Sequence, residues 1–289
     1  MNDSSAYTIQ RVISNNVVQV QGDQPGTEII LTGKGLGFGV KAGAELASDD
    51  PRIEKKYMLD DQQETDRYQS MFDQIDREVL DVSQDIISMI SKEFDTDLND
   101  QVFFALPSHI QFALHRLKSE MEIVNPFIFE IQTLHHKEYE IAQKAADMIA
   151  QAFSIDVPEP EVGFLAMHIQ SAVCHVSLGN IVKDTHLIQE LVSAIEEAKD
   201  IHIPRDSIDY VRLITHLRFA IERLKTGKVS KNPFVNQLKE SLPEEYVLAK
   251  KVSAILGERL ELPVPEDEIG YIVMHLYRLF QQYDPKSQS

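Results

Sequence analysis

The feature that most constrains this chain is an internal repeat that contains no insertion or deletion. The stretch 109–168 recurs as 216–275, so both ends are separated by 107 positions. Each copy has a histidine at each end, and the four are His109, His168, His216 and His275. The pairs matched between these ends include Phe112 with Phe219, Arg116 with Arg223, Asn125 with Asn232, Tyr139 with Tyr246, and Gly163 with Gly270. Among the repeated residue types only histidine can change its charge near neutral pH. The repeat therefore indicates that imidazole chemistry was duplicated.

The repeated region is predicted to be α-helical. Apolar residues after position 68 recur at helical spacing, at positions 72, 75, 79, 82, 86 and 90, and the same period continues in segments that end near prolines. We predict two tandem all-α helical bundles, one at 65–176 and one at 177–285. Two copies indicate a tandem duplication, because a solenoid needs three repeats or more.

The N-terminal 60 residues have a different pattern. Segments 7–13, 17–20 and 28–31 are rich in β-branched residues, and a run with glycine at every second position, 33–39, follows them. This predicts a small antiparallel all-β domain of four short strands, which we place at 1–60. The polar, acidic segment 44–64 is predicted to be a linker that runs into a helix. Such a small sheet has a very small core, so we expect a homodimer in which a second copy stabilises it.

Composition excludes several classes of protein. The 289 residues carry 28 basic and 46 acidic side chains, a net charge of −18, which argues against a general nucleic-acid-binding surface. Nearly all of this charge lies beyond residue 58, so a polyanion would have to meet the N-terminal segment. With one cysteine there is no disulfide framework, and with no membrane-spanning run or signal segment we expect a cytoplasmic protein without membrane insertion.

The histidines allow three interpretations. They pack at the margin of a core, they bind a metal, or they carry a phosphoryl group on nitrogen. Metal binding is disfavoured because no HExxH pattern is present, and no nucleophile on a strained turn indicates a hydrolase. Arg116 and Arg223 follow the first histidine of each repeat by seven residues, on the same helical face. They either meet such a phosphate or form ordinary surface salt bridges.

The glycine-rich run fits neither a phosphate-binding loop nor a dinucleotide site. Alternate glycines in a β context let another backbone or a ligand approach closely. The sparse cations and amides of this region, Arg11, Asn15, Asn16 and Lys34, accompany the aromatic Phe38. Cations, amides and a stacking ring together are typical of proteins that read RNA loops and bulged bases. A tight-turned sheet with no ligand is the alternative.

Taken together, the segments 11–17 and 33–39 and the paired histidines resemble the BglG/SacY/LicT-type transcriptional antiterminators, most of all the glucose-operon members. The resemblance covers essentially the whole chain. It implies a co-antiterminator RNA-binding domain followed by two PTS regulation domains, with dimerisation through the small sheet. It also implies RNA contacts at Arg11, Asn15, Asn16, Gly33, Lys34 and Phe38. Many members have lysine where Arg11 stands and arginine where Lys34 stands.

The resemblance further implies how such a protein is controlled. The family's phosphorylation sites match His109 and His168 in the first regulatory domain and His216 and His275 in the second. The sugar-specific enzyme II of the PTS would phosphorylate the first domain when its sugar is absent, and HPr would phosphorylate the second. The function expected is antitermination at an RNA hairpin that overlaps a terminator, with no enzymatic activity, cofactor or metal. The alternatives are a phosphotransfer component of the sugar-transport chain, and a regulator with the same helical domains that does not act through RNA.

Overall fold

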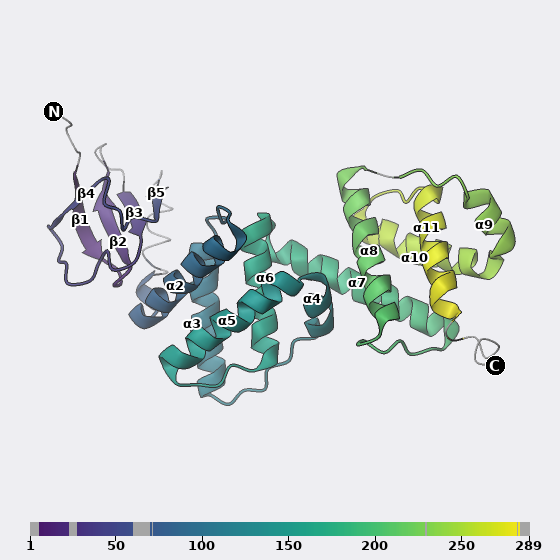
Figure 1. Ribbon diagram of the computed structural model, residues 1–289, viewed down its shortest axis with the longest axis horizontal. Helices are drawn as coiled ribbons and strands as arrows, with labels where there is room; N and C mark the ends of the chain where they lie inside the picture. Colours follow the sequence, from purple (N-terminus) through teal and green to yellow (C-terminus); the bar gives the residue numbers. More distant parts are fainter. Residues whose placement is uncertain are drawn as a thin grey trace. The chain divides into compact units, whose positions relative to one another are not determined.

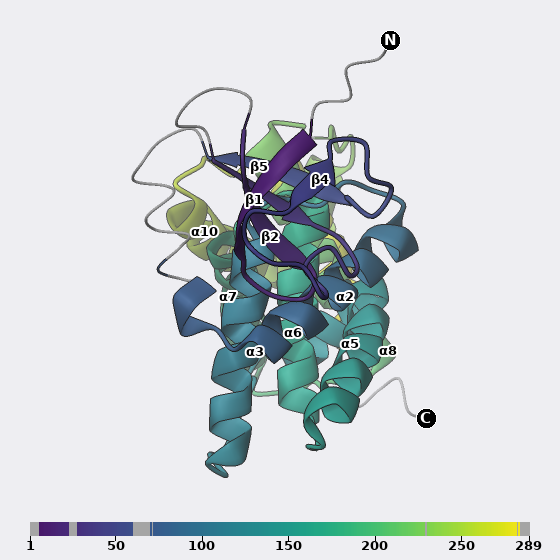
Figure 2. The same ribbon diagram turned by 90° about the vertical axis from the view of Figure 1, so that its left-hand side faces the viewer.

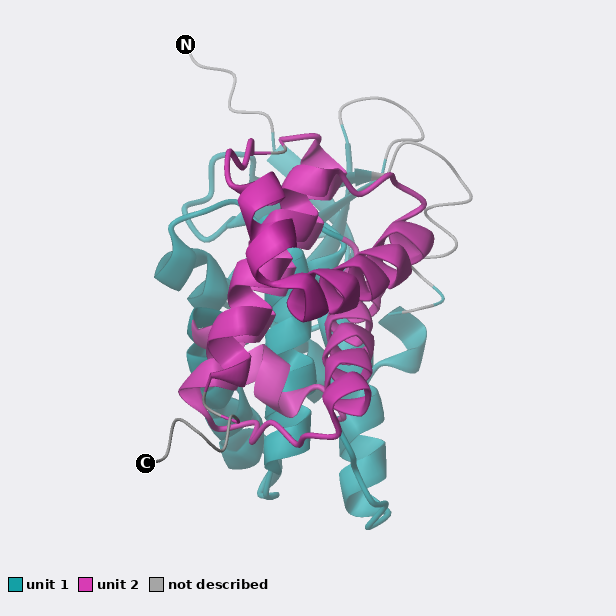
Figure 3. Cartoon of the chain, turned by 90° about the vertical axis from the view of Figure 1, so that its right-hand side faces the viewer, with its two compact units in different colours: residues 1–125, 137–176 teal, residues 126–136, 177–289 magenta. Residues whose placement is uncertain are grey.

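The computed structural model divides the chain into two compact units (Figures 1 and 3). It describes residues 6–22, 28–59, 70, 72–228, 230–281 and 283. Unit 1 contains residues 1–125 and 137–176, and unit 2 contains residues 126–136 and 177–289. Each unit is described by itself below.

Unit 1 begins with a five-stranded antiparallel sheet (Figure 2). The strands are β1 (Ala6–Val12), β2 (Val17–Gln21), β3 (Glu28–Thr32), β4 (Glu45–Ala47) and β5 (Lys55–Leu59). Their order in the sheet is β4-β1-β2-β3-β5, and the register of β1 on β2 shifts between Ile9 and Arg11. A small antiparallel domain followed by helices confirms the predicted fold class.

Two local predictions about this domain were wrong. The run 33–39 forms turns instead of the fourth strand, and the segment 44–64, expected to be a linker, contains β4 and β5. Strand β5 pairs with β3 along its whole length, from Lys55 opposite Thr32 to Leu59 opposite Glu28. Its sequence, Lys-Lys-Tyr-Met-Leu, is too polar at its start to stand out. Pairing with a neighbouring strand determines its structure more than its own propensity does.

The central strands are buried on both faces. Val18, Val20 and Leu31 belong to a core that is closed by Leu36 from the loop after β3 and by Leu46 from β4. On the other face the ring of Tyr57 lies 4.5 Å from that of Phe103, a residue of helix α3 (Val102–Lys118). The second face of this small sheet is therefore covered by helices of the same unit.

The helices of unit 1 are α2 (Arg77–Phe94), α3 (Val102–Lys118), α5 (His136–Phe153) and α6 (Glu159–Cys174). In α2 the predicted apolar positions Val79, Ile86 and Ile90 are all buried. The start of α6 is set by Pro158, whose extended backbone precedes the first turn. The expected start of the helical region near residue 68 lies outside the described residues.

Unit 2 contains α4 (Ile128–Leu134), α7 (Leu178–Lys199), α8 (Ile208–Thr226), α9 (Val235–Ser241), α10 (Pro243–Leu260) and α11 (Glu266–Phe280). The hydroxyls of Ser177 and Ser207 accept hydrogen bonds from the backbone amides of Asn180 and Tyr210, so each serine caps the helix that follows it. In the core of this unit, Leu191, Ile214, Val252 and Leu276 are fully buried.

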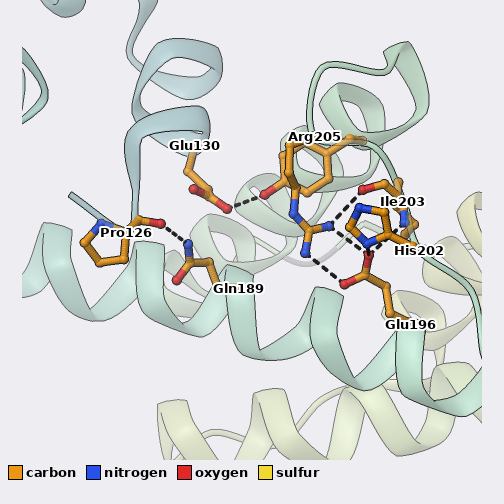
Figure 4. Close-up of polar contacts among 8 residues, drawn as sticks. Pro126, Glu130, Gln189, Glu196, His202, Ile203 and Arg205 are labelled. Atoms are coloured by element: carbon orange, nitrogen blue, oxygen red, sulfur yellow. Dashed lines mark hydrogen bonds and ion pairs between the residues drawn. The ribbon is translucent and has the colours of Figure 1, made fainter. Parts of the chain in front are cut away.

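Helix α4 lies between α3 and α5 in the sequence, yet it packs in unit 2. The amide of Gln189 donates to the carbonyl of Pro126 at 2.6 Å, and the hydroxyl of Tyr210 donates to the carboxylate of Glu130 (Figure 4). Glu130 is buried, so this hydrogen bond satisfies a polar group that water does not reach.

The Glu130 contact lies beside a second polar cluster of unit 2. Arg205 binds both carboxylate oxygens of Glu196, at 3.0 and 2.8 Å, and the backbone amide of Ile203 donates to the same carboxylate at 2.8 Å (Figure 4). Burial and the hydrogen bond to Glu130 raise the pKa of Tyr210. The polar groups around this end of α8 are thus held by charged partners.

The predicted domain boundaries at 60, 65 and 285 lie outside the described residues, and the boundary at 176/177 stays a prediction. In the described part of the chain, no single helix is long and apolar enough to cross a membrane. The consecutive helices α6 and α7 together reach the length and the apolar composition of a membrane span, but neither helix does so alone.

Candidate functional sites: two histidine pairs and a loop surface

The first histidine pair lies where α3 packs against α6. The rings of His109 and His168 have centroids 4.6 Å apart and planes tilted by 37°. Nε2 of His109 lies 3.4 Å from Oε2 of Glu161, a buried carboxylate at the start of α6. The ring of Phe164 closes one side, 6.3 Å from His109. Two imidazoles, separated by most of the repeat in sequence, thus share one half-buried site.

Burial, followed by the neighbouring His109, lowers the pKa of His168 to about 3. At neutral pH this ring is therefore uncharged and keeps one nitrogen lone pair free. A neutral imidazole is the form that attacks a phosphoryl group. The geometry suits nucleophilic chemistry on nitrogen, and in the described residues no group of three His, Cys, Asp or Glu side chains is placed to hold a metal ion.

The second pair lies where α8 packs against α11, at the matching positions. The rings of His216 and His275 are stacked, with centroids 3.5 Å apart and planes inclined by 17°. Burial, and then the charge of Arg223 and Arg278, lowers the pKa of His216. Burial, His216 and the same two arginines lower the pKa of His275 to about 4. Both shifts favour uncharged rings in this second pair at pH 7.

Arg116 and Arg223, the two arginines at matching positions of the repeat, each form an ion pair with a glutamate. Arg116 forms an ion pair with Oε1 of Glu161 at 2.5 Å, and Arg223 binds both oxygens of Glu268 at 2.8 and 2.6 Å. Glu268 is completely buried, so the pair is not an ordinary surface salt bridge. The two repeated arginines therefore neutralise two repeated, buried carboxylates, which sequence reasoning missed.

The two sites differ in their surroundings. A small cavity of about 30 Å³ beside the second pair is lined by Arg212, His216, His275 and Arg278, with Asp209 at its edge. The positions that match Arg212 and Arg278 in the first repeat are Ala105 and Ser171. A search for repeated residues cannot find these two arginines because they occur only once.

The glycine run packs against the turn between β1 and β2. A Cβ atom on Gly33 would lie 1.8 Å from the carbonyl oxygen of Arg52, and one on Gly37 would lie 2.2 Å from that of Ser14. Side chains at these two positions would collide with backbone, which is why glycine is needed there. The alternate glycines were expected to let another backbone or a ligand approach closely. The backbone that approaches them belongs to the same chain, at Ser14 and Arg52.

Asn15 and Asn16 hold this loop in place. The amide of Gly35 donates to Oδ1 of Asn16 at 2.8 Å, and the amide of Gly37 donates to the carbonyl of Asn15 at 2.9 Å. Asn16 is buried, so part of its role is to fix the backbone of the run 33–37. Asn15, Asn16, Gly33 and the neighbouring Lys34 therefore lie in one loop region, which we call the loop surface, with Asn15 and Lys34 exposed and Asn16 and Gly33 buried beneath them.

The polar groups of this surface face carboxylates of the α2 region. Nδ2 of Asn15 donates to Asp81 at 2.8 Å, and the backbone amide of Asn16 donates to the other oxygen of Asp81 at 3.1 Å. Arg11 forms an ion pair with Asp73, and Nζ of Lys34 lies 3.7 Å from Asp85. Four of the six predicted RNA contacts are thus occupied by acidic partners of the same unit.

In the part of the chain that the structure describes, Gly33 and Phe38 have no such partner, and Phe38 is 73% exposed, so its ring is open to stacking. A further cation that sequence reasoning did not select lies nearby. Arg52 donates from its guanidinium to the carbonyl of Gly35 at 3.2 Å, and its charge is balanced by Asp50. It comes from the segment expected to be a linker, so no motif indicated it.

Comparison with known proteins finds a family match for the N-terminal sheet region and for both helical repeats. The CAT RNA binding domain model matches residues 7–66, and the PRD domain model matches residues 84–172 and 189–279. The "PtsGHI operon antiterminator" of Bacillus subtilis is 35% identical over 278 residues, which span 96% of this chain and 98% of that protein. "Transcription antiterminator LicT" of the same organism is 31% identical, across 95% of this chain and 99% of the relative.

A third relative is the "GlcA/glcB genes antiterminator" of Staphylococcus carnosus, 32% identical across 96% of this chain and 97% of that protein. Among solved structures, the crystal structure of GlcT CAT-PRDI matches with a TM-score of 0.51 and 34% identity. It covers 58% of this chain, and 99% of that structure is matched.

Proposed function

Because the chain belongs to the family of RNA-binding transcription antiterminators built from a CAT domain and PRD domains, we propose that it acts at the leader of a sugar PTS operon, with glucose as the expected sugar. Its RNA target is a hairpin that overlaps a terminator. Its regulators are the sugar-specific enzyme II and HPr, which phosphorylate the first and second helical domains. The protein acts as a homodimer that joins two CAT domains into one RNA surface.

The observation that supports this switch most directly is the pairing of two imidazoles in each repeat, together with the lowered pKa of His168, His216 and His275. A phosphoryl group on His109 or His168 adds about two negative charges in a half-buried site. In this first site the nearest charged group is the buried carboxylate of Glu161, and Arg116 is already paired with it. Arg116 is therefore not free to balance the added charge and burial opposes it, so α3 and α6 must shift their packing to accommodate the modified ring.

A shift of α3 and α6 also reaches the CAT sheet within unit 1. Strand β5 packs through Tyr57 on Phe103 of α3, in the same helix that carries His109. The proposed consequence is that two phosphorylated subunits no longer hold their CAT domains in one composite surface. A bias of a few kcal/mol is enough to invert such an equilibrium.

The switch is tested with a reporter gene placed behind the terminator. The double variant His109→Ala, His168→Ala is expected to give antitermination without sugar, because no phosphoryl group can be accepted in the first domain. The control is His115→Ala, which removes an exposed histidine of the same helix that has no counterpart in the repeat. A double variant that still responds to sugar would refute the assignment.

The RNA surface is tested separately by fluorescence anisotropy with the leader hairpin in a salt series. Lys34→Ala is expected to weaken binding and to reduce the salt slope by about one unit, as expected for a phosphate contact. Phe38→Ala is expected to lose about 1–3 kcal/mol because a stacked base is lost. Lys41→Ala and Met58→Ala, at exposed positions of the same domain, are the matched controls. Equal losses in variants and controls would contradict this surface.

A further inference from the structure

The two histidine pairs have different charged surroundings, although the repeat aligns them without a gap. In the first pair the neighbour is a carboxylate, Glu161, at 3.4 Å from His109. In the second pair the matching Glu268 is fully engaged by Arg223, and the cavity beside the rings is lined by Arg212 and Arg278. Glu161 is likewise paired, with Arg116, so the two sites differ in the further arginines Arg212 and Arg278, which line only the second.

Helical spacing explains why these arginines reach the rings. Arg212 precedes His216 by one turn on α8, and Arg278 follows His275 by three residues on α11, so each shares a face with its histidine. Arg212 is balanced by Asp209 at 3.9 Å. Arg278 forms no salt bridge among the described residues, and its exposed side chain lines the cavity.

We propose that Arg278, assisted by Arg212, forms an oxyanion-binding site that holds the phosphoryl group carried by His216 or His275, and that the first repeat lacks this site. The inference rests on the proposed function, because it assigns a partner to the phosphoryl group of that mechanism. Arginine suits this role since its planar guanidinium binds phosphoryl oxygens through two parallel hydrogen bonds.

The site gives the two phosphorylations opposite physical consequences. In the second repeat the added charge meets an uncommitted guanidinium, so the modified ring is neutralised where it lies and the α8–α11 packing is kept. In the first repeat Ala105 and Ser171 offer no cation, and the guanidinium of Arg116 is already paired with Glu161. Residues that differ between the repeats, and not the histidines themselves, then decide whether the modification stabilises or disrupts its domain.

The test uses the full chain and phosphoramidate, a small phosphoryl donor that needs no partner protein. In the reaction its P–N bond breaks and a new P–N bond forms to an imidazole nitrogen. The imidazole proton leaves with ammonia as ammonium. Mass spectrometry of peptides then follows the occupancy of each histidine during labelling, and its decay after the reagent is removed.

The variants exchange matched residues between the repeats. Phosphohistidine in the second repeat of the wild-type protein is expected to decay roughly tenfold more slowly than in the first, as expected for a charge-assisted contact. Arg278→Ser, which installs the residue of the first repeat, is expected to remove most of this difference. Ser171→Arg is expected to slow decay in the first repeat. Arg259→Ser, an exposed arginine of α10 paired with Glu190, controls for net charge.

Decay rates in the second repeat that are equal in the wild-type protein and in Arg278→Ser would overturn the oxyanion site, while the labelled histidines would still support the proposed function. A wild-type protein in which none of the four histidines accepts a phosphoryl group would instead overturn the proposed phosphorylation itself. The two failures are therefore distinct.

Discussion

Replacing Asp81 with alanine is expected to tighten binding of the leader hairpin. Asp81 lies on α2 and accepts hydrogen bonds from Nδ2 of Asn15 at 2.8 Å and from the backbone amide of Asn16 at 3.1 Å. Both donors belong to the proposed RNA surface, so RNA must displace the carboxylate before it can use them. Carboxylate oxygens at these positions occupy donors that would otherwise bind RNA phosphates or bases.

The size of the effect follows from these two contacts. A hydrogen bond to a charged group contributes about 1.5–3 kcal/mol when it is buried, and exposed ionic contacts contribute about 0–1 kcal/mol. Two half-exposed contacts therefore hold the loop surface against α2 by about 1–2 kcal/mol in total. Since 1.4 kcal/mol is a factor of ten, the dissociation constant is expected to fall by about 5- to 30-fold.

The assay is fluorescence anisotropy of the labelled hairpin at one fixed salt concentration. Asp147→Ala is the control, because it removes one exposed carboxylate from α5 of the same unit and changes net charge equally. That variant is expected to change the dissociation constant by less than about twofold, through long-range charge alone. If Asp81→Ala and Asp147→Ala bind the hairpin equally well, the α2 carboxylates do not compete with RNA.

The remaining predictions concern stability. Because the pKa of His168 is lowered to about 3, the unfolded chain binds a proton below pH 6.5 that the native chain does not. Stability therefore falls with decreasing pH, and the wild-type protein is expected to lose about 1.3 kcal/mol more than His168→Gln between pH 7.5 and 5.5, measured by urea unfolding. An equal loss in both would contradict a neutral His168. Tyr210→Phe leaves the carboxylate of Glu130 buried without its donor and is expected to destabilise unit 2 by about 1–3 kcal/mol, whereas Thr226→Val, at an exposed position of α8, is expected to change stability by less than about 0.5 kcal/mol. A thermal midpoint unchanged in Tyr210→Phe would exclude that contact as a stabilising one. Gly37→Ala is expected to lower the thermal midpoint, since its Cβ would lie 2.2 Å from the carbonyl oxygen of Ser14, and an unchanged midpoint would mean that this turn relaxes freely.

The sequence predicted what local periodicity encodes. Apolar spacing on one helix face identified the helical region, including Val79, Ile86 and Ile90 of α2, because a helix places every third or fourth residue on the same side. Alternating β-branched residues identified β1, β2 and β3. They did not identify β5, whose structure depends on pairing with β3. The same limit explains why α4 could not be assigned to unit 2 from its sequence, since Tyr210 and Gln189 lie far from it along the chain.

The sequence by itself determined which residues were duplicated, and so it identified the four histidines and the family. Only the tertiary structure decided what each of them meets: Glu161 beside His109, and Arg278 beside the stacked rings of the second pair. It also decided that the loop surface faces Asp81. The physical reason is that a repeat records what two copies share, whereas charge and hydrogen bonding depend on neighbours brought together by packing, many of which occur only once.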